Sequence, residues 1–431
     1  MSIDQQTQPG SIEAEATPVR RPAPTAFPYR EAMSRPMIRR ARKLAKRLTG
    51  KDLFPTAEQI EAFHGDMYHA DPIAERFVDE VFYGEIGQER GREILKQALA
   101  HGIESIEDPP ESMVALFREF EEVPEWVDPA LVEAGAQIWR RWGTFLFSVA
   151  GGETLEMYTE AAVATPLSLA GGYAGDNALR RFLETSRFWI DVSEPGALLT
   201  PGSKGRATAM LVRVMHVSVR RRVADHPEWH IDRWGIPISQ AYMLLTLSGG
   251  SVVPALALWL VGVQTTRREI YALIHFQRYM GHIVGVRNTW YPETIADTLR
   301  LLALVSTARS HDSGEHGAEL IESFPKAFAP RGGHTGLQRL REEYNGRIYA
   351  AYSRLFMMPW TYAKYRMPNA WPGLAWIALR FPLLAAVETA RRIPPIGRLH
   401  EAVMVAHRES WYRAQMSGRE AEFDASGALR R

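Results

Sequence analysis

The hydrophobic positions of this chain recur mainly at intervals of three or four residues, the spacing of an α-helix. From residue 56 onward this pattern predicts helices over 71–87, 90–101, 111–121, 129–150, 178–192, 205–224, 237–249, 252–263, 266–284 and 292–308. Four segments lack the pattern and are predicted to be loops: 150–177, 193–204, 225–236 and 309–335. Because alternating, strand-like patterns and hairpin signals are scarce, we expect an all-α helical bundle.

Two segments are apolar enough to raise the question of a membrane. Residues 241–263 carry no charge and are long enough to cross a bilayer, but Gly249-Gly250 and Pro254 divide them, which predicts two buried helices around a tight bend. Residues 366–395 are rich in aromatic side chains between basic groups. They could form a membrane-surface helix or a packed C-terminal helix, and core packing is favoured because no clean polar face is present.

The N-terminal region differs in character from the rest of the chain. Residues 1–28 are polar and proline-rich and lack the apolar core of a secretory signal, so we expect a disordered tail. Residues 35–48 form a basic amphipathic helix, which could contact anionic lipid or simply be a solvated first helix. The expected compartment is the cytoplasm, with peripheral membrane contact left open.

The composition of the chain limits the kinds of chemical site that it can contain. The 431 residues are 46% hydrophobic and 23% charged, which are values of a globular protein, and the net charge of +1 gives no electrostatic reason to expect nucleic-acid binding. The chain has no cysteine, which excludes disulfides, iron–sulfur clusters and cysteine nucleophiles. Any bound metal must therefore use His, carboxylate, Tyr or Met ligands. No serine-nucleophile elbow, Walker loop or dinucleotide-binding glycine motif is present.

One histidine lies on the apolar side of a basic helix in residues 206–222, RATAMLVRVMHVSVRRR. His216 falls on the side that otherwise carries small and branched apolar residues. A helix-borne histidine is a common ligand of haem iron, and Arg213 and Arg220 lie three and four residues away, where they could meet the haem propionates. The alternative is that His216 is an ordinary core residue, and periodicity alone favours that alternative.

Four blocks of sequence together resemble a known family. They are LRRFLETSRFWIDV (179–192), GRATAMLVRVMHVSVRR (205–221), WGIPISQAYMLLTLS (234–248) and HFQRYMGHIVGV (275–286). In this order the blocks resemble the rubber oxygenase superfamily, which includes latex clearing proteins and the MpaB-type oxygenases of mycophenolic acid biosynthesis. The resemblance covers about residues 140–300.

The resemblance implies a haem b protein with a globin-like helical core. Its axial iron ligand would be His216, flanked by Arg213 and Arg220 as cofactor-binding residues. Residues 51–431 would then form a single all-α oxygenase-type catalytic domain, preceded by a tail and basic amphipathic segment at 1–50.

On the opposite, distal helix the resemblance places Arg181 and Thr185, which are i, i+4 neighbours and can face one cavity. The position before Thr185 is Glu184 here, whereas latex clearing protein has a lysine. A carboxylate there could act as a general base if burial raises its pKa. This departure, and the absence of an export signal in the sequence, weaken the case for rubber itself as the substrate.

The resulting hypothesis is a haem-dependent oxygenase that uses dioxygen on a hydrophobic, alkene-containing or prenylated small molecule, with cleavage of a C=C bond as the implied reaction. The alternatives are a haem-binding sensor or carrier and a non-haem membrane-surface protein. The sequence leaves the oligomeric state open.

Overall fold

The computed structural model describes residues 21–170, 178–308, 311–330 and 335–417, together with 421 and 423, and every regular element in them is helical. The first half contains α1 (Tyr29–Ser34), α2 (Pro36–Thr49), α3 (Ala57–Asp66), α4 (Pro72–Phe77), the π-helical η1 (Val78–Phe82), α5 (Gln88–His101), the 3-10 turn η2 (Ile103–Ser105), α6 (Glu111–Glu121), α7 (Pro129–Trp142), α8 (Thr144–Met157), α9 (Ala161–Leu169) and α10 (Ala178–Val192). The second half contains α11 (Lys204–Ala224), α12 (Ile231–Trp234), α13 (Gln240–Ser248), α14 (Val252–Ala257), the 3-10 turn η4 (Leu258–Val261), α15 (Arg267–Ile283), α16 (Ile295–Ala308), α17 (Gly314–Ala327), α18 (Gly336–Phe356), α19 (Pro359–Lys364), α20 (Trp371–Ala390) and α21 (Pro394–Met416). The predicted all-α fold is confirmed.

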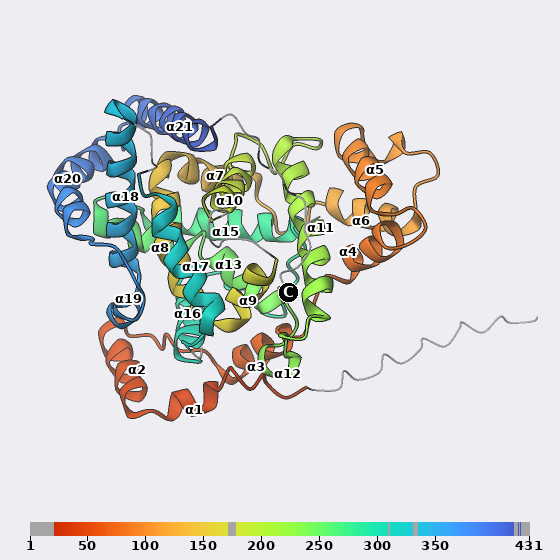
Figure 1. The fold of residues 1–431 in the computed structure, drawn as a ribbon, viewed down its shortest axis with the longest axis horizontal. Helices are drawn as coiled ribbons and strands as arrows, with labels where there is room; N and C mark the ends of the chain where they lie inside the picture. The colour runs from red at the N-terminus through yellow and green to blue at the C-terminus, as the bar shows by residue number, and fades with distance from the viewer. Residues whose placement is uncertain are drawn as a thin grey trace, which may run out of the picture.

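The centre of the molecule is built on α7 and α15, which pack against each other along their length (Figure 1). Around this pair, α10 packs on α11, α8 on α18, and α17 on α9. Helices α4, α5 and α6 project at one edge, and α18, α20 and α21 lie at the opposite edge (Figure 1). The arrangement places α11 between the central pair and the α4–α6 group.

Side-chain caps fix where several helices begin. Thr56 and Gln59 have the residue types and spacing that mark a helix start in sequence, and they form a capping box at the start of α3. Ser203 caps α11 by accepting a hydrogen bond from the backbone N–H of Arg206. The predicted ranges 111–121 and 178–192 coincide with α6 and α10, and α11 extends one residue beyond its predicted start. The uncharged segment forms two helices, α13 and α14, around a bend, as predicted.

The predicted loop at 150–177 is wrong, because α8 continues to residue 157 and α9 follows it. The paired glycines Gly151-Gly152 and Gly171-Gly172 have the sequence pattern of hinges or tight turns, but Gly151 and Gly152 lie inside α8. A Cβ atom on Gly151 would meet the ring of Phe324 at 2.4 Å, and one on Gly152 would meet the carbonyl oxygen of Tyr352 at 2.8 Å. These glycines therefore serve close helix packing rather than chain flexibility. Gly171-Gly172 lie outside the described residues.

Two further boundaries differ from the sequence prediction. The expected helix at 129–150 is divided at Gly143, whose φ of 54° a residue with a side chain rarely adopts. The expected loop at 309–335 contains α17, which buries Leu320, Ile321 and Phe324. Gly314 and Gly317 at the start of α17 and its internal Pro325 obscured this apolar stripe in the sequence.

The predictions for both terminal regions are wrong in part. Residues 21–28 belong to the predicted tail, yet Phe27 is buried against Phe63, and Thr25 and Ala26 hydrogen-bond to the backbone near α12. Residues 1–20 lie outside the described residues. The preference for core packing at 366–395 is wrong, because α20 buries only Gly373, Ile377 and Glu388.

Two segments pass a length and composition test for crossing a membrane. The first is 240–261, of which 61% of the most apolar window is buried, as expected of a core segment. The second is α20, with only 17% buried.

Candidate functional site

His216 lies in the middle of α11 in an environment that suppresses its charge. Burial, assisted by the nearby Arg220 cation, lowers the pKa of His216 from 6.5 to about 4. The imidazole is therefore neutral at pH 7. Its Nδ1 atom is inaccessible to solvent and has no hydrogen-bond partner among the residues that the structure describes. A buried ring nitrogen without a partner is costly in an ordinary core.

The side of α11 that carries His216 is not fully closed by packing. Val219, on this side, is only half-buried, as is His216 itself, whereas Ala209, Val212 and Val223 on the same side are buried. On α9, which contacts α11, Val163 and Leu167 are also half-buried although they border the hydrophobic core. Apolar side chains therefore retain accessible surface around the histidine, as they would in a binding site for an apolar group.

The distal residues predicted from sequence lie on α10, which packs against α11. Arg181 and Thr185 are half-buried and share one side of the helix. Glu184 is buried and accepts a hydrogen bond of 2.8 Å from Arg181, while the Nε atom of Arg180 lies 3.7 Å away. The carboxylate that replaces the family's lysine is thus held by two arginines of its own helix.

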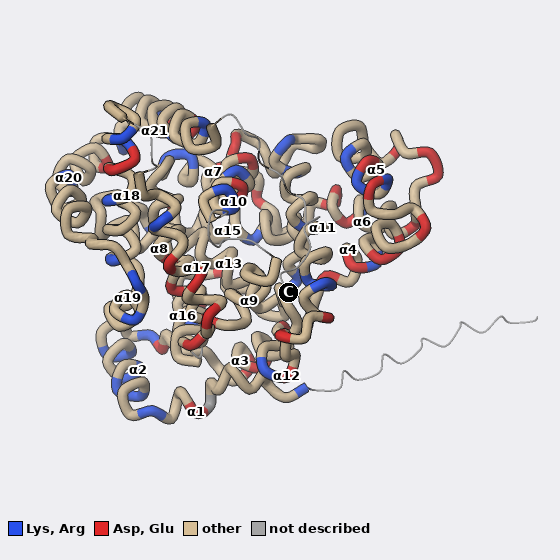
Figure 2. The backbone as a smooth tube through the Cα atoms, viewed as in Figure 1, with Lys and Arg blue, Asp and Glu red and all other residues tan. Residues whose placement is uncertain are grey.

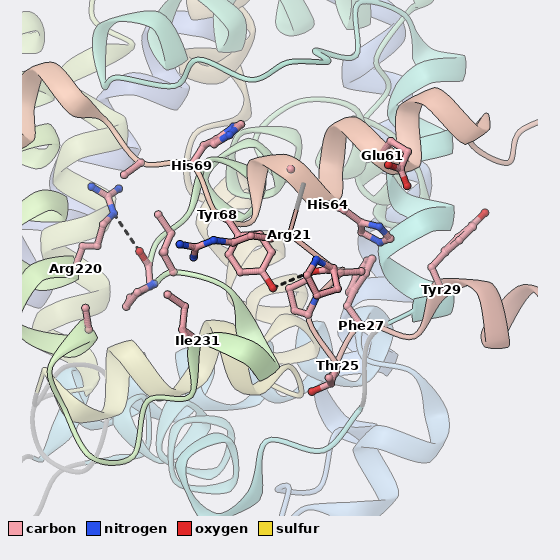
Figure 3. Close-up of a pocket in the computed structure, with 18 of the residues that line it drawn as sticks. Arg21, Thr25, Phe27, Tyr29, Glu61, His64, Tyr68, His69, Arg220 and Ile231 are labelled. Atoms are coloured by element: carbon pink, nitrogen blue, oxygen red, sulfur yellow. Dashed lines mark hydrogen bonds between the residues drawn. The ribbon is translucent and has the colours of Figure 1, made fainter. Parts of the chain in front are cut away.

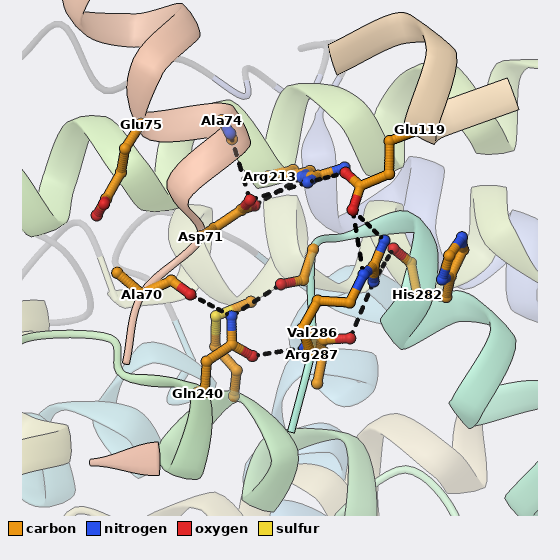
Figure 4. Close-up of polar contacts among 12 residues, drawn as sticks. Ala70, Asp71, Ala74, Glu75, Glu119, Arg213, Gln240, His282, Val286 and Arg287 are labelled. Atoms are coloured by element: carbon orange, nitrogen blue, oxygen red, sulfur yellow. Dashed lines mark hydrogen bonds and ion pairs between the residues drawn. The ribbon is translucent and has the colours of Figure 1, made fainter. Parts of the chain in front are cut away.

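Arg213 is buried and serves a structural network (Figure 4). Its guanidinium donates two hydrogen bonds to Asp71, of 2.6 and 2.9 Å, and a third to Glu119. Glu119 also accepts hydrogen bonds from Arg287. These contacts join α11 to the start of α4 and to α6. The described partners of Arg213 are protein carboxylates, so this geometry does not support the predicted contact with a propionate.

Gly285 makes room for the Asp71–Arg213 pair. Its φ is 82°, and a Cβ atom at this position would lie 2.0 Å from Oδ2 of Asp71 and 2.6 Å from Nε of Arg213. Both the backbone conformation and the close approach therefore require glycine.

Arg220 connects two of the sequence blocks that carry the family resemblance. Its guanidinium donates to the carbonyl oxygens of Pro237 and Ile238, at 3.1 and 2.7 Å, and forms an ion pair with Glu75 at 3.1 Å. Ile238 has a φ of 49°, which is rare for a β-branched residue, and the guanidinium helps to hold it there. Like Arg213, Arg220 contacts protein groups, and the predicted propionate contact is not supported by its geometry either.

Gln240 is the last residue of the GIPISQ segment (235–240) in the third sequence block. Its side chain connects several chain segments, a role that the sequence analysis did not assign. Its side-chain amide donates to the carbonyl oxygens of Ala70 and Gly285, and its oxygen accepts from the backbone N–H of Arg287 (Figure 4). All three bonds are 2.7–2.9 Å long. The motif therefore holds the chain segments that surround the Asp71–Arg213 pair.

Glu153 on α8 is a candidate that sequence reasoning missed. Its Oε1 atom is inaccessible and has no hydrogen-bond partner among the described residues, and burial raises the pKa of this carboxyl well above its usual range. The signal in the sequence was a single acid in the otherwise apolar stretch that precedes Thr154. A carboxyl whose pKa is raised in this way is able to donate or accept a proton in an enclosed site.

A large cavity of about 1550 Å³ lies on a different side of α11 (Figure 3). The N-terminal segment from Arg21 to Tyr29 and residues of α3 form its walls, and Tyr68 donates a hydrogen bond to the carbonyl oxygen of Pro22. From α11 it is lined by Val217, Arg220, Arg221 and Ala224, but not by His216. The cavity is therefore separate from the histidine.

Comparison with known proteins adds a family match. A family model described as "ER-bound oxygenase mpaB/B'/Rubber oxygenase, catalytic domain" matches residues 136–392, which is more than half of the chain. The match includes α10, α11, α13 and α15, the helices that carry the four sequence blocks described above.

Two individual proteins are also similar. The chain is 29% identical to the rubber oxygenase of Streptomyces sp. (strain K30) over 188 residues, which are 41% of this chain and only 44% of that relative. The fold is similar to a solved structure of latex clearing protein LCP in the closed state, with a TM-score of 0.59 and 20% sequence identity. That alignment covers 80% of this chain and 91% of the solved one.

Proposed function

The chain belongs to the family of ER-bound oxygenase mpaB/B' and rubber oxygenase catalytic domains, as its sequence blocks predicted, and from this premise we propose that it is a haem b-dependent oxygenase. In this proposal its substrates are dioxygen and a hydrophobic, alkene-containing or prenylated small molecule, and the reaction is oxidative cleavage of a C=C bond. The proposed compartment is the cytoplasm.

The observation that carries the proposal is the state of His216. A histidine ligand must be neutral to bind iron, and burial holds the pKa of His216 at about 4. Its Nδ1 atom has no hydrogen-bond partner within the described ranges of the chain, and the nearby apolar residue Val219 keeps accessible surface. These features fit a haem held by His216 between α11 and neighbouring helices, in a globin-like core.

When bound, haem supplies the iron chemistry that activates dioxygen, and the chain's own residues do the rest. Arg213 and Arg220 act as positioning residues, because their ion pairs fix α11 and thereby the imidazole. Arg181 and Thr185 provide donors on the distal side, where fixed dipoles stabilise developing negative charge. The half-buried apolar side chains exclude water and receive the oily substrate.

Two carboxyl groups are candidates to move a proton. Glu184 is adjacent to Thr185 and bonded to Arg181, so it can exchange a proton close to the distal donors. Glu153 is the second candidate, because burial raises the pKa of its carboxyl well above the usual range. In this proposal Glu184 remains the first candidate, since it lies on the same helix as the distal residues.

The experiment that tests the cofactor is an absorption spectrum of the purified protein, before and after dithionite and carbon monoxide, with the haem quantified as its pyridine complex. We expect one haem b per chain, a Soret band, and a shift on binding carbon monoxide. His216→Ala should lose the stoichiometric haem, while the exposed-site control Arg221→Ala should keep it. A His216→Ala protein that retains stoichiometric haem would exclude His216 as the ligand.

A haem-binding protein without oxygenase chemistry is the second candidate. It is favoured by the pairing of Arg181 with Glu184, which reduces the positive charge available on the distal side. Oxygen uptake by the reduced protein with a panel of isoprenoid alkenes separates the two. Uptake that depends on substrate supports the oxygenase, and haem binding without such uptake supports the alternative.

A further inference from the structure

Helix α20 exposes a continuous apolar surface to solvent. Trp371, Leu379 and Leu383 are 77%, 72% and 66% exposed, and Trp376 is also exposed. The neighbouring turn η4 adds Trp259 and Leu260, and Gly262 places this turn in contact with the backbone of α20 at Phe381. We call this surface the α20 face and define it by six residues: Trp259, Leu260, Trp371, Trp376, Leu379 and Leu383. Exposed apolar patches of this kind mark interaction sites.

The opposite side of α20 fastens the helix to the body of the protein. Gly373 allows α20 to approach α18, because a Cβ atom there would meet the carbonyl oxygen of Arg347 at 2.1 Å. Ile377 is buried, and buried Glu388 forms an ion pair of 2.6 Å with Arg391. The helix therefore lies along the protein surface and presents only its outer side.

The C-terminal end of α20 meets the start of α15, where Arg391 contacts Glu269 and the carbonyl oxygen of Gln264. Three nearby carboxylates are already paired with largely buried arginines: Glu269 with Arg141, Glu388 with Arg391, and Glu401 with Arg140. By contrast, the exposed Arg267, Arg268 and Arg398 have no ion-pair partner among the described residues. An apolar surface bordered by unpaired cations is complementary to an anionic, oily partner.

The basic helix α2 lies toward the same edge of the molecule (Figures 1 and 2). It has no buried residue, and it exposes Leu44 and Leu48 among lysines and arginines. Figure 2 shows its basic residues on the side of the molecule where α20 and α19 also lie. The two elements could therefore meet one extended surface together.

We propose that the α20 face docks the protein on the surface of an anionic lipid bilayer. The tryptophans and leucines enter the boundary between headgroups and acyl chains, where amphipathic tryptophan rings are favoured. Arg267, Arg268 and Arg398, with the basic side chains of α2, contact the anionic headgroups. Docking goes beyond the proposed oxygenase activity, and it would bring the enzyme to the phase in which oily substrates collect.

A lipid surface fits this face better than a second copy of the chain. A twofold dimer built on it would bring unpaired arginines of the same sign toward one another, which opposes association. A helix crossing the bilayer fits less well, because it would have to break the Glu388–Arg391 pair and the close contact at Gly373.

The test is sedimentation of the full chain with vesicles of phosphatidylcholine alone or mixed equally with phosphatidylglycerol. We expect binding to the anionic vesicles that salt weakens but does not abolish. Leu379→Asp combined with Leu383→Asp should reduce the partition coefficient roughly tenfold or more, because each change replaces an apolar side chain at the acyl boundary by a carboxylate. The matched control is Val123→Asp, an exposed apolar residue in the α6–α7 connection at the opposite edge, and it should bind like the parent protein.

Charge is tested separately with Arg267→Glu combined with Arg268→Glu, which should weaken binding to anionic vesicles more than binding to neutral ones. Thermal unfolding of each variant checks that the fold is retained. Parent protein that stays in the supernatant, or an aspartate double variant that binds equally well, would overturn the proposal. So would a parent dimer that the aspartate variant converts to a monomer without any vesicle binding. None of these readouts requires turnover or haem, so failure here is distinct from failure of the proposed function.

Discussion

The polar groups along one side of α11 differ in how they are satisfied. The guanidinium groups of Arg213 and Arg220, which we call the paired groups, are held by carboxylates and backbone carbonyls from α4, α6 and the segment before α13. His216 lies between them on the same side of the helix, and its buried Nδ1 atom has no hydrogen-bond partner among the described residues. Protein contacts account for the paired groups. The unpaired imidazole costs free energy without a ligand, which is why we place the cofactor there.

The largest effect should come from removing the contacts of a paired group. Arg213→Ala leaves Asp71 and Glu119 without their buried partner, and removal of one member of a buried ion pair costs about 3–5 kcal/mol. Urea unfolding should show this loss. Arg221→Ala, on the same helix, removes a partly exposed pair with Asp79 and should cost no more than about 1 kcal/mol. Similar losses in the two variants would contradict the structural role of Arg213.

The unpaired imidazole of His216 can be tested by measuring stability as a function of pH. Because the folded state holds the pKa of His216 at about 4, below its usual 6.5, folding favours the neutral ring. Its contribution to stability is therefore complete above pH 6.5 and is lost as the pH falls from 6.5 toward 4.

The unfolding free energy of the protein without added haem should thus fall between about pH 7 and about pH 4.5. In His216→Ala this fall should be smaller, by at most about 2–3 kcal/mol. Burial also lowers the pKa of His282 to about 4, so the wild type and the variant share that part of the pH dependence. Parallel pH profiles of unfolding free energy in the two proteins would show that His216 is not held neutral by the fold.

The smallest effect tests how closely Gly285 packs against the Asp71–Arg213 pair. Gly285→Ala should destabilise by about 2 kcal/mol, because it combines an unfavourable positive φ with a close approach to Asp71. Gly50→Ala is the matched control, since Gly50 also has a positive φ but has no atom near its Cβ position, and it should cost about 1 kcal/mol. Equal thermal shifts would mean that the Asp71–Arg213 pair can move aside at no cost.

Local sequence was sufficient for most of the helices and for some of the site. Helical periodicity located α6, α10 and α11, and the Thr56–Gln59 pair located the start of α3. It failed at Gly151 and Gly152, where glycine serves packing against another helix rather than a turn. The periodicity could indicate that His216 is unusual, but it could not identify Asp71 and Glu119, which meet Arg213 from distant parts of the chain.

The sequence by itself determined the all-α class, the caps and the order of the family blocks, because these depend on residues only a few positions apart. Only the tertiary structure decided that Arg213 and Arg220 are neutralised by carboxylates and that α20 remains exposed. It alone also showed that Oε1 of Glu153 is inaccessible and has no hydrogen-bond partner in the described part of the chain. Burial and pairing depend on which segments meet in space. For α20, the same apolar composition is compatible with a buried core helix and with an exposed interaction surface.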